Sequence, residues 1–154
     1  MSGGVFLIGH SLLYLLLAAV AGITMATQGS INSILGKKIG IIEASLIVHL
    51  TAVIILIFLL IFNINKGTIS HWKDLPWYLY LGGLLGVIIS YTVIISIPRL
   101  GVAVATTAII AAQVLTAAII DHFGIFGIDT VPFTWIKMVG IIFLAAGVRL
   151  LLIQ

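Results

Sequence analysis

A few polar side chains interrupt an otherwise apolar chain, and any binding chemistry must depend on them. Gln28, Asn32 and Gln113 carry carboxamides, which both donate and accept hydrogen bonds. His49 carries an imidazole, which could carry a coupling proton or meet the substrate. The alternative is a neutral ring bonded to the backbone or to Ser45. Tyr91 adds a phenolic hydroxyl. These residue types favour a polar site that binds a small solute.

The composition indicates which solvent surrounds these side chains. The chain has 154 residues, of which 62% are hydrophobic and 7% charged, and its mean hydropathy is +1.38. A soluble domain carries roughly a quarter charged residues, so we expect this chain to lie in a lipid bilayer. It has no cysteine, which excludes disulfides and thiolate metal sites. Its net charge of +3 gives no sign of a nucleic-acid partner.

Charged and turn-forming residues divide the chain into five apolar runs. Gly40, Gly101 and Gly124 are expected at junctions, and PRLG (98–101) is expected to break the chain. Pro76 and Pro132 suit the first turns of helices. Each run has about twenty residues, enough for a helix to cross a hydrocarbon core of roughly 30 Å. The first run continues past the length of a signal peptide, so we interpret it as a retained helix. We predict one all-α integral membrane domain over residues 1–154. Its five transmembrane helices are expected near 11–35, 41–64, 77–97, 101–121 and 132–153.

Five spans would place the two termini on opposite sides of the membrane. The lysines and arginines then divide three against four: Lys66, Lys73 and Lys137 on one side, and Lys37, Lys38, Arg99 and Arg149 on the other. The positive-inside rule therefore selects no orientation. One interpretation is a single, weakly specified topology. The other is insertion in both orientations and pairing as an antiparallel homodimer of ten helices, with inverted repeats around a central site near the midplane.

Three predicted helices each place a polar residue at a similar depth. Gln28, His49 and Tyr91 lie about seven or eight residues from one membrane surface, which is roughly 10–12 Å along a helix. Gln113 lies nearer the midplane. Polar groups in hydrocarbon tend to face cavities or partners. The expected residues lining a substrate pathway are Gln28, Asn32, His49, Tyr91 and Gln113.

The first predicted helix has the most regular polar pattern. Thr24, Gln28 and Asn32 recur at every fourth position and should therefore share one face. One interpretation is that this face lines a pathway. The other is that its side chains form hydrogen bonds between helices and hold the bundle together. The spacing is compatible with both.

Charged residues near the predicted helix ends favour structural roles. Glu43 opens the second helix, where the macrodipole favours a carboxylate, and a part in coupling is the alternative to capping. Asp121 closes the fourth helix, where the dipole disfavours an acid, so we expect it to orient the following turn. Arg99 follows Pro98, and we expect it to anchor a loop.

The segment GGLLG places Gly82 and Gly86 one helical turn apart. Small residues allow membrane helices to approach one another closely. Packing within one chain is the favoured interpretation of this pair. A dimer interface through the third or fourth helix is a weaker hypothesis, because this spacing is common in membrane helices.

Five segments resemble a known family: ATQGSINSILGKKIG, GGLLGVII, SIPRLGVA, AAQVLTAAIIDHFGIFG and GIIFLAAGVRLLL. Together they resemble the YdcZ-like family, a half-length branch of the drug/metabolite transporter superfamily. The resemblance covers nearly the whole chain. It implies five-helix chains that assemble as homodimers or heterodimers, or fused ten-helix proteins, and transport of a small solute that is not assigned. We expect the protein in the bacterial inner (plasma) membrane and expect no cofactor.

The chain departs from this family at two places. Ala112 precedes the glutamine of the fourth helix, where family members often have glycine. The second helix contains Glu43 and His49, where apolar residues are frequent, and this difference indicates a subfamily with its own substrate or coupling ion. The small multidrug carriers of the same superfamily use a glutamate in the first helix, and this chain has none there.

The sequence thus favours a secondary transporter that works as an antiparallel homodimer. A gradient would supply its energy, because the chain has no phosphate-binding loop. Two alternatives stay open: a non-transport membrane subunit that stabilises a partner, and a narrow ion channel. We expect no enzyme, no catalytic residue and no bound metal, because no HExxH or GxSxG motif is present and the acidic residues do not pair.

Overall fold

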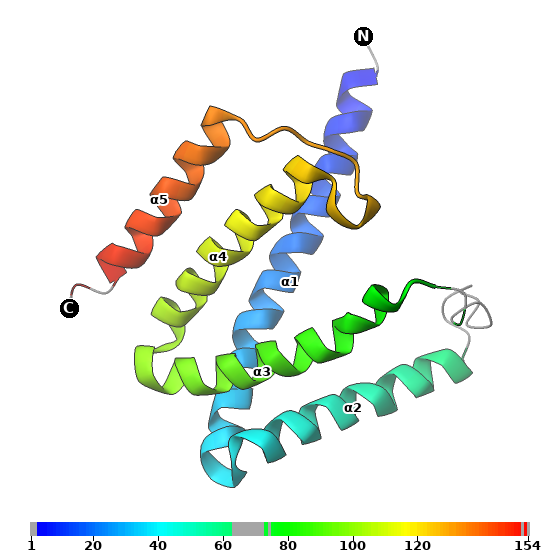
Figure 1. Cartoon of the computed structure of the whole chain (residues 1–154), viewed down its shortest axis with the longest axis vertical. Helices are drawn as coiled ribbons and strands as arrows, with labels where there is room; N and C mark the ends of the chain where they lie inside the picture. The colour runs from blue at the N-terminus through cyan, green and yellow to red at the C-terminus, as the bar shows by residue number, and fades with distance from the viewer. Residues whose placement is uncertain (1–2, 63–72, 74, 152, 154) are drawn as a thin grey trace. The chain divides into compact units, whose positions relative to one another are not determined.

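The computed structural model describes residues 3–62, 73, 75–151 and 153, and every regular element in this part of the chain is helical (Figure 1). The elements are α1 (Gly3–Ile39), α2 (Ile41–Ile61), the 3-10 helix η2 (Trp77–Tyr80), α3 (Leu81–Leu100), α4 (Val102–Phe123), the 3-10 helix η3 (Ile125–Gly127) and α5 (Trp135–Leu151). The prediction of an all-helical chain with five long helices is therefore confirmed.

Within the described residues, four segments have the length and composition to cross a membrane. They are Leu12–Ile39, Ile41–Ile61, Trp77–Leu100 and Val102–Phe123. Helix α5 has 17 residues, which places it at the lower end of the range of about 17–25 residues for a spanning helix. The fifth span, and with it the opposite placement of the two termini, stays a prediction.

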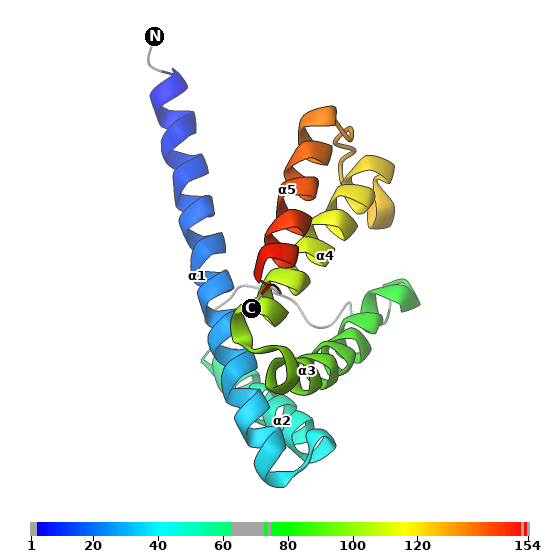
Figure 2. The ribbon, with the colours of Figure 1, turned by 90° about the vertical axis from the view of Figure 1, so that its left-hand side faces the viewer.

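The chain comprises two compact units, Met1–Ile95 and Ser96–Gln154, and each is described by itself. In the first unit, α1 and α2 meet at their common turn and diverge away from it (Figure 1). In the second unit, α4 packs along α5, as both views show (Figure 2). Helix α4 also contacts η3. The pairs α1–α2 and α4–α5 are thus neighbours in the sequence.

The core of the first unit includes Ala44 on α2 and Ile94 on α3. Ala44 is 0% exposed and Ile94 is 2% exposed. The Cγ2 methyl of Ile94 lies where a Cβ atom on Gly36 would stand. The absence of a side chain at Gly36 therefore allows Ile94 to approach the backbone of α1, as small residues do in membrane helix packing.

Most leucine, isoleucine and phenylalanine side chains on α2 are exposed, as expected of a helix that faces lipid rather than water. Helices α2 and α4 begin after Gly40 and Gly101, whose φ angles are 104° and 81°. Helix α4 ends at Gly124, which has φ 59°. All three glycines were predicted at junctions, and the structure confirms them there.

The end of α3 differs from the prediction. The segment PRLG was expected to break the chain, but Pro98 lies inside α3 and Arg99 lies in its last turn. Proline removes one hydrogen-bond donor from a helix and crowds the carbonyl of the preceding turn, but the helix continues past Pro98, because the Gly101 N–H still donates to the Ile97 carbonyl at 2.9 Å. An arginine in a last turn also interacts favourably with the macrodipole. Arg99 thus lies in a helical turn rather than in a loop, and its expected anchoring role stays a prediction.

Other helix boundaries also differ from the prediction. Helix α1 continues to Ile39, so Lys37 and Lys38 lie in its last turn, where the macrodipole favours basic side chains. Helix α5 begins at Trp135 rather than at Pro132, and residues 128–134 are not helical. Pro132 therefore does not occupy the first turn that it was expected to open.

Candidate functional site

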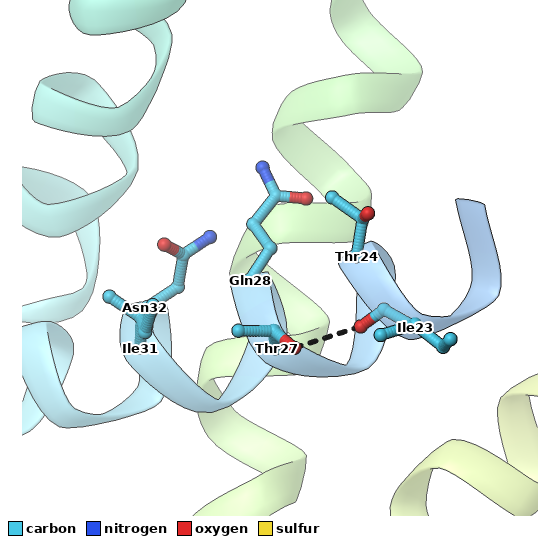
Figure 3. Close-up of a pocket in the computed structure, with 6 residues that line it drawn as sticks. All are labelled: Ile23, Thr24, Thr27, Gln28, Ile31 and Asn32. Atoms are coloured by element: carbon cyan, nitrogen blue, oxygen red, sulfur yellow. Dashed lines mark hydrogen bonds between the residues drawn. The ribbon is translucent and has the colours of Figure 1, made fainter. Parts of the chain in front are cut away.

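One face of α1 carries a groove with a volume of about 340 Å³. The residues that line it are Ile23, Thr24, Thr27, Gln28, Ile31 and Asn32. The side chains of Thr24, Gln28 and Asn32 point to the same side of the helix (Figure 3). This arrangement is what a spacing of four residues predicts for a helix.

The threonine hydroxyls in the groove are already bonded to the helix backbone. Thr24 Oγ1 donates to the Val20 carbonyl at 2.8 Å, and Thr27 Oγ1 donates to the Ile23 carbonyl at 2.9 Å (Figure 3). Each hydroxyl has one proton and two lone pairs. Because the protons are used within α1, the threonines can offer a ligand only an acceptor.

The carboxamides in the groove, by contrast, have no partner among the residues that the structure describes. Asn32 is only 7% exposed, yet in the part of the chain that the structure describes its side chain makes no hydrogen bond. Gln28 is exposed and likewise unpaired among these residues. No fully buried side-chain nitrogen or oxygen among the described residues lacks a partner, so the amide atoms of Asn32 remain accessible. A polar group left unpaired away from water costs about 1–3 kcal/mol.

His49 is held by its own helix and faces α3. Its Nδ1 lies 2.7 Å from the Ser45 carbonyl oxygen. Because a carbonyl only accepts hydrogen bonds, Nδ1 is the donor, and a neutral ring then leaves Nε2 as an acceptor. Nε2 lies 3.4 Å from the position of a Cβ atom on Gly86. The lone pair of His49 is thus directed at a place on α3 without a side chain.

The two glycines of GGLLG have different surroundings. Gly86 packs against His49, whereas a Cβ atom on Gly82 would have nothing within 4 Å. Packing within the chain therefore accounts for Gly86 and leaves Gly82 next to open space. The hypothesis of a dimer interface at Gly82 stays a prediction.

Tyr91 and Gln113 occupy exposed positions. Tyr91 is 43% exposed on α3, and Gln113 is exposed on α4 in the second unit. Neither side chain forms a hydrogen bond within the described residues. Their place on a pathway together with Gln28 and His49 stays a prediction.

Glu43 lies in the first turn of α2, where the macrodipole favours a carboxylate. Its carboxylate folds back over Gly40, the residue before the helix, and occupies the place of a Cβ atom there. No side chain forms a capping hydrogen bond at this end of α2. The position agrees with an electrostatic role at the helix terminus, and a coupling role stays an untested alternative.

The turn after α4 is held by His122 and by backbone bonds rather than by the side chain of Asp121. The Phe133 N–H donates to His122 Nδ1 at 3.2 Å, and the Val131 N–H donates to the Asp121 carbonyl at 2.8 Å. The Asp121 carboxylate has no ion pair among the described residues. No role was predicted for His122. Its position just before Gly124, which ends α4 in a left-handed conformation, was the available signal.

Among the described residues, no three histidine, aspartate or glutamate side chains lie close enough to hold a metal ion. The chemistry of the groove is therefore that of carboxamides, hydroxyl oxygens and isoleucine side chains. It can bind a solute by hydrogen bonding and apolar contact.

Comparison with known families gives one match. The family described as "Putative inner membrane exporter, YdcZ" matches residues 13–150. Comparisons with curated proteins and with solved structures find no match. The family match and the four helices of membrane-spanning length place the protein in the inner membrane. Because the match covers most of the chain and agrees with the resemblance found in the sequence, the chain belongs to the YdcZ family.

Proposed function

We propose that the protein exports a small solute as a secondary carrier and that the groove on α1 contributes its binding site. The family description supports export. The observation that carries the assignment of the groove is Asn32, a carboxamide that is 7% exposed and has no hydrogen-bond partner among the described residues. Polar groups at membrane depth are costly and mark substrate pathways. A gradient would drive export, since the sequence has no phosphate-binding loop.

We further propose that the carrier is an antiparallel homodimer whose subunits are inserted in opposite orientations. The near-equal division of lysines and arginines supports this arrangement, because it gives neither orientation an advantage. A second, inverted copy would supply a second polar face from the opposite surface. Ten helices enclose a pathway that five helices cannot, and an in-plane two-fold axis gives alternating access.

The solutes released by cells test the carrier role of the groove. Cells that produce the wild-type protein or Asn32→Leu at equal membrane abundance are compared by mass spectrometry of their medium. We expect at least one solute to accumulate outside only with the wild type. Thr51→Val is the control, because Thr51 lies on α2 outside the groove and bonds only to the Ile47 carbonyl. Identical profiles for wild type and Asn32→Leu would contradict the proposal.

Cysteine labelling tests the dimer model, since the chain has no cysteine of its own. Ser70→Cys is the site for the label; Ser70 lies outside the residues that the structure describes, and it is chosen from the sequence alone. With dual insertion, we expect an impermeant thiol reagent to label about half of the protein on intact cells, and the rest after permeabilisation. Labelling from one side only would contradict the dual-topology model.

Two alternative functions predict different results. A narrow channel predicts an ion conductance that requires no solute, measured in planar bilayers. A subunit that only stabilises a partner predicts no solute release and a stable complex with another membrane protein. Export that depends on Asn32 is expected only for the carrier.

A further inference from the structure

The class of solute can be deduced from the groove on α1, and this inference rests on the proposed function. We infer that the groove takes an uncharged solute with a primary amide or urea group on a small aliphatic body. Three features of the groove lead to this class: its lack of charge, its balance of donors and acceptors, and its apolar walls.

The first feature is the absence of charge. All six side chains that line the groove are uncharged. The charged residues of α1 are Lys37 and Lys38, which are exposed in its last turn and begin five positions beyond Asn32. A charged solute at membrane depth needs an opposite charge beside it. The groove offers none, so it disfavours both carboxylates and ammonium groups.

The second feature is the supply of hydrogen bonds. The carboxamides of Gln28 and Asn32 each provide an oxygen acceptor and N–H donors. The hydroxyls of Thr24 and Thr27 provide only acceptors, because their protons bond to backbone carbonyls. A primary amide complements this set, since its NH₂ group donates to the acceptors and its carbonyl accepts from Gln28 or Asn32. A urea group does the same with more donors.

The third feature is the apolar part of the groove. Ile23 and Ile31 line it together with the polar residues. A volume of about 340 Å³ is at the lower end of the range of ligand pockets, which is about 300–1,000 Å³. A short branched aliphatic group fits beside the isoleucines while the amide end meets the carboxamides.

Three probes with one carbon skeleton test this class: 3-methylbutanamide, 3-methylbutanoate and 3-methylbutylammonium. Binding of each is titrated by ligand-observed NMR to the full chain in lipid nanodiscs near neutral pH. We expect the amide to bind at least about tenfold more tightly than the two ions. Gln28→Leu and Asn32→Leu should each weaken amide binding about tenfold, and the control Thr51→Val should leave it unchanged. Gln28→Glu should reverse the preference towards the ammonium probe.

Several results would overturn the inference: equal or tighter binding of either ion, amide binding that Asn32→Leu leaves intact, or binding of none of the three probes. Efflux of the same probes from proteoliposomes separates this inference from the proposed function. Amide binding that depends on Asn32, without efflux above protein-free liposomes, would uphold the solute class and refute export. Efflux that depends on Asn32 but favours an ion would uphold export and refute the class.

Discussion

The imidazole Nε2 of His49 on α2 lies 3.4 Å from the position that a Cβ atom would occupy on Gly86 of α3. The bond from His49 Nδ1 to the Ser45 carbonyl, at 2.7 Å, fixes the ring in this orientation. A histidine therefore fills the space that the glycine leaves. The contact joins His49 to one of the two glycines in GGLLG. It gives a structural reason for both His49 and Gly86 that the sequence alone does not provide.

A larger side chain at Gly86 should disturb this contact. We expect Gly86→Leu to destabilise the protein by about 1–3 kcal/mol, because overpacking displaces the neighbouring ring. The measurement is thermal unfolding in detergent. Gly83→Leu is the matched control, since a Cβ atom on Gly83 would have nothing within 4 Å. An equal loss of stability in both variants would contradict the role of the contact.

The tautomer of His49 is a second prediction. The bond to the Ser45 carbonyl requires the proton on Nδ1. We expect ¹⁵N NMR of the neutral ring to give the Nδ1–H tautomer, with Nε2 as the unprotonated nitrogen. His49→Phe identifies the signal by removing it. Observation of the Nε2–H tautomer would mean that the ring has another orientation.

The turn between α1 and α2 should be sensitive to substitution at Gly40. Its φ of 104° is unfavourable for any residue with a Cβ atom, and the Glu43 carboxylate occupies the space of that atom. We expect Gly40→Ala to cost about 1–3 kcal/mol from the backbone alone. The further substitution Glu43→Ala should restore only the part due to crowding.

Gly22→Ala is the control for this experiment. Gly22 lies within α1, and a Cβ atom there would have nothing within 4 Å. Alanine is favoured over glycine by up to about 1 kcal/mol inside a helix, so Gly22→Ala should leave the melting temperature unchanged or raise it. If Gly40→Ala were equally harmless, the described turn would be wrong.

The turn after α4 allows backbone strain to be separated from crowding. Gly124 and Gly127 both have positive φ, 59° and 80°. A Cβ atom on Gly124 would lie 2.8 Å from Thr130 Cγ2 and 3.0 Å from the Ile128 carbonyl oxygen, whereas on Gly127 it would meet nothing. We expect Gly124→Ala to lower the melting temperature more than Gly127→Ala. Hydrogen exchange at Phe133, whose N–H donates to His122, should accelerate only in Gly124→Ala. Equal effects of both substitutions would rule out crowding.

Helix positions could be predicted because they depend on local properties of the chain. Long apolar runs must form helices in a bilayer to satisfy their backbone groups, and the predicted junction glycines Gly40, Gly101 and Gly124 all have positive φ. The end of α3 was mispredicted because Pro98 removes one donor without ending the helix. Arg99 consequently moved from a loop into a helical turn.

The partners of the polar residues could not be predicted in the same way. In water, an apolar stripe identifies the buried face of a helix, but these helices are apolar on all sides, and no such stripe separates faces towards lipid from faces towards protein. The structure shows Asn32 buried and Gln113 exposed, although both interrupt similar apolar runs in the sequence. The contact of His49 with Gly86 joins residues on different helices, and that of His122 with the Phe133 N–H closes a loop.

By itself, the sequence determined the membrane setting, the helical class and the junction glycines, because composition and local backbone chemistry suffice for these, and it indicated the family through the resemblance of its segments. Only the tertiary structure decided that Asn32 has no partner within the described part of the chain, that Gly86 faces His49 and that His122 rather than the Asp121 carboxylate holds the last turn. Those contacts depend on how segments pack in three dimensions, and hydrophobic periodicity carries no information about packing in a solvent as apolar as the protein.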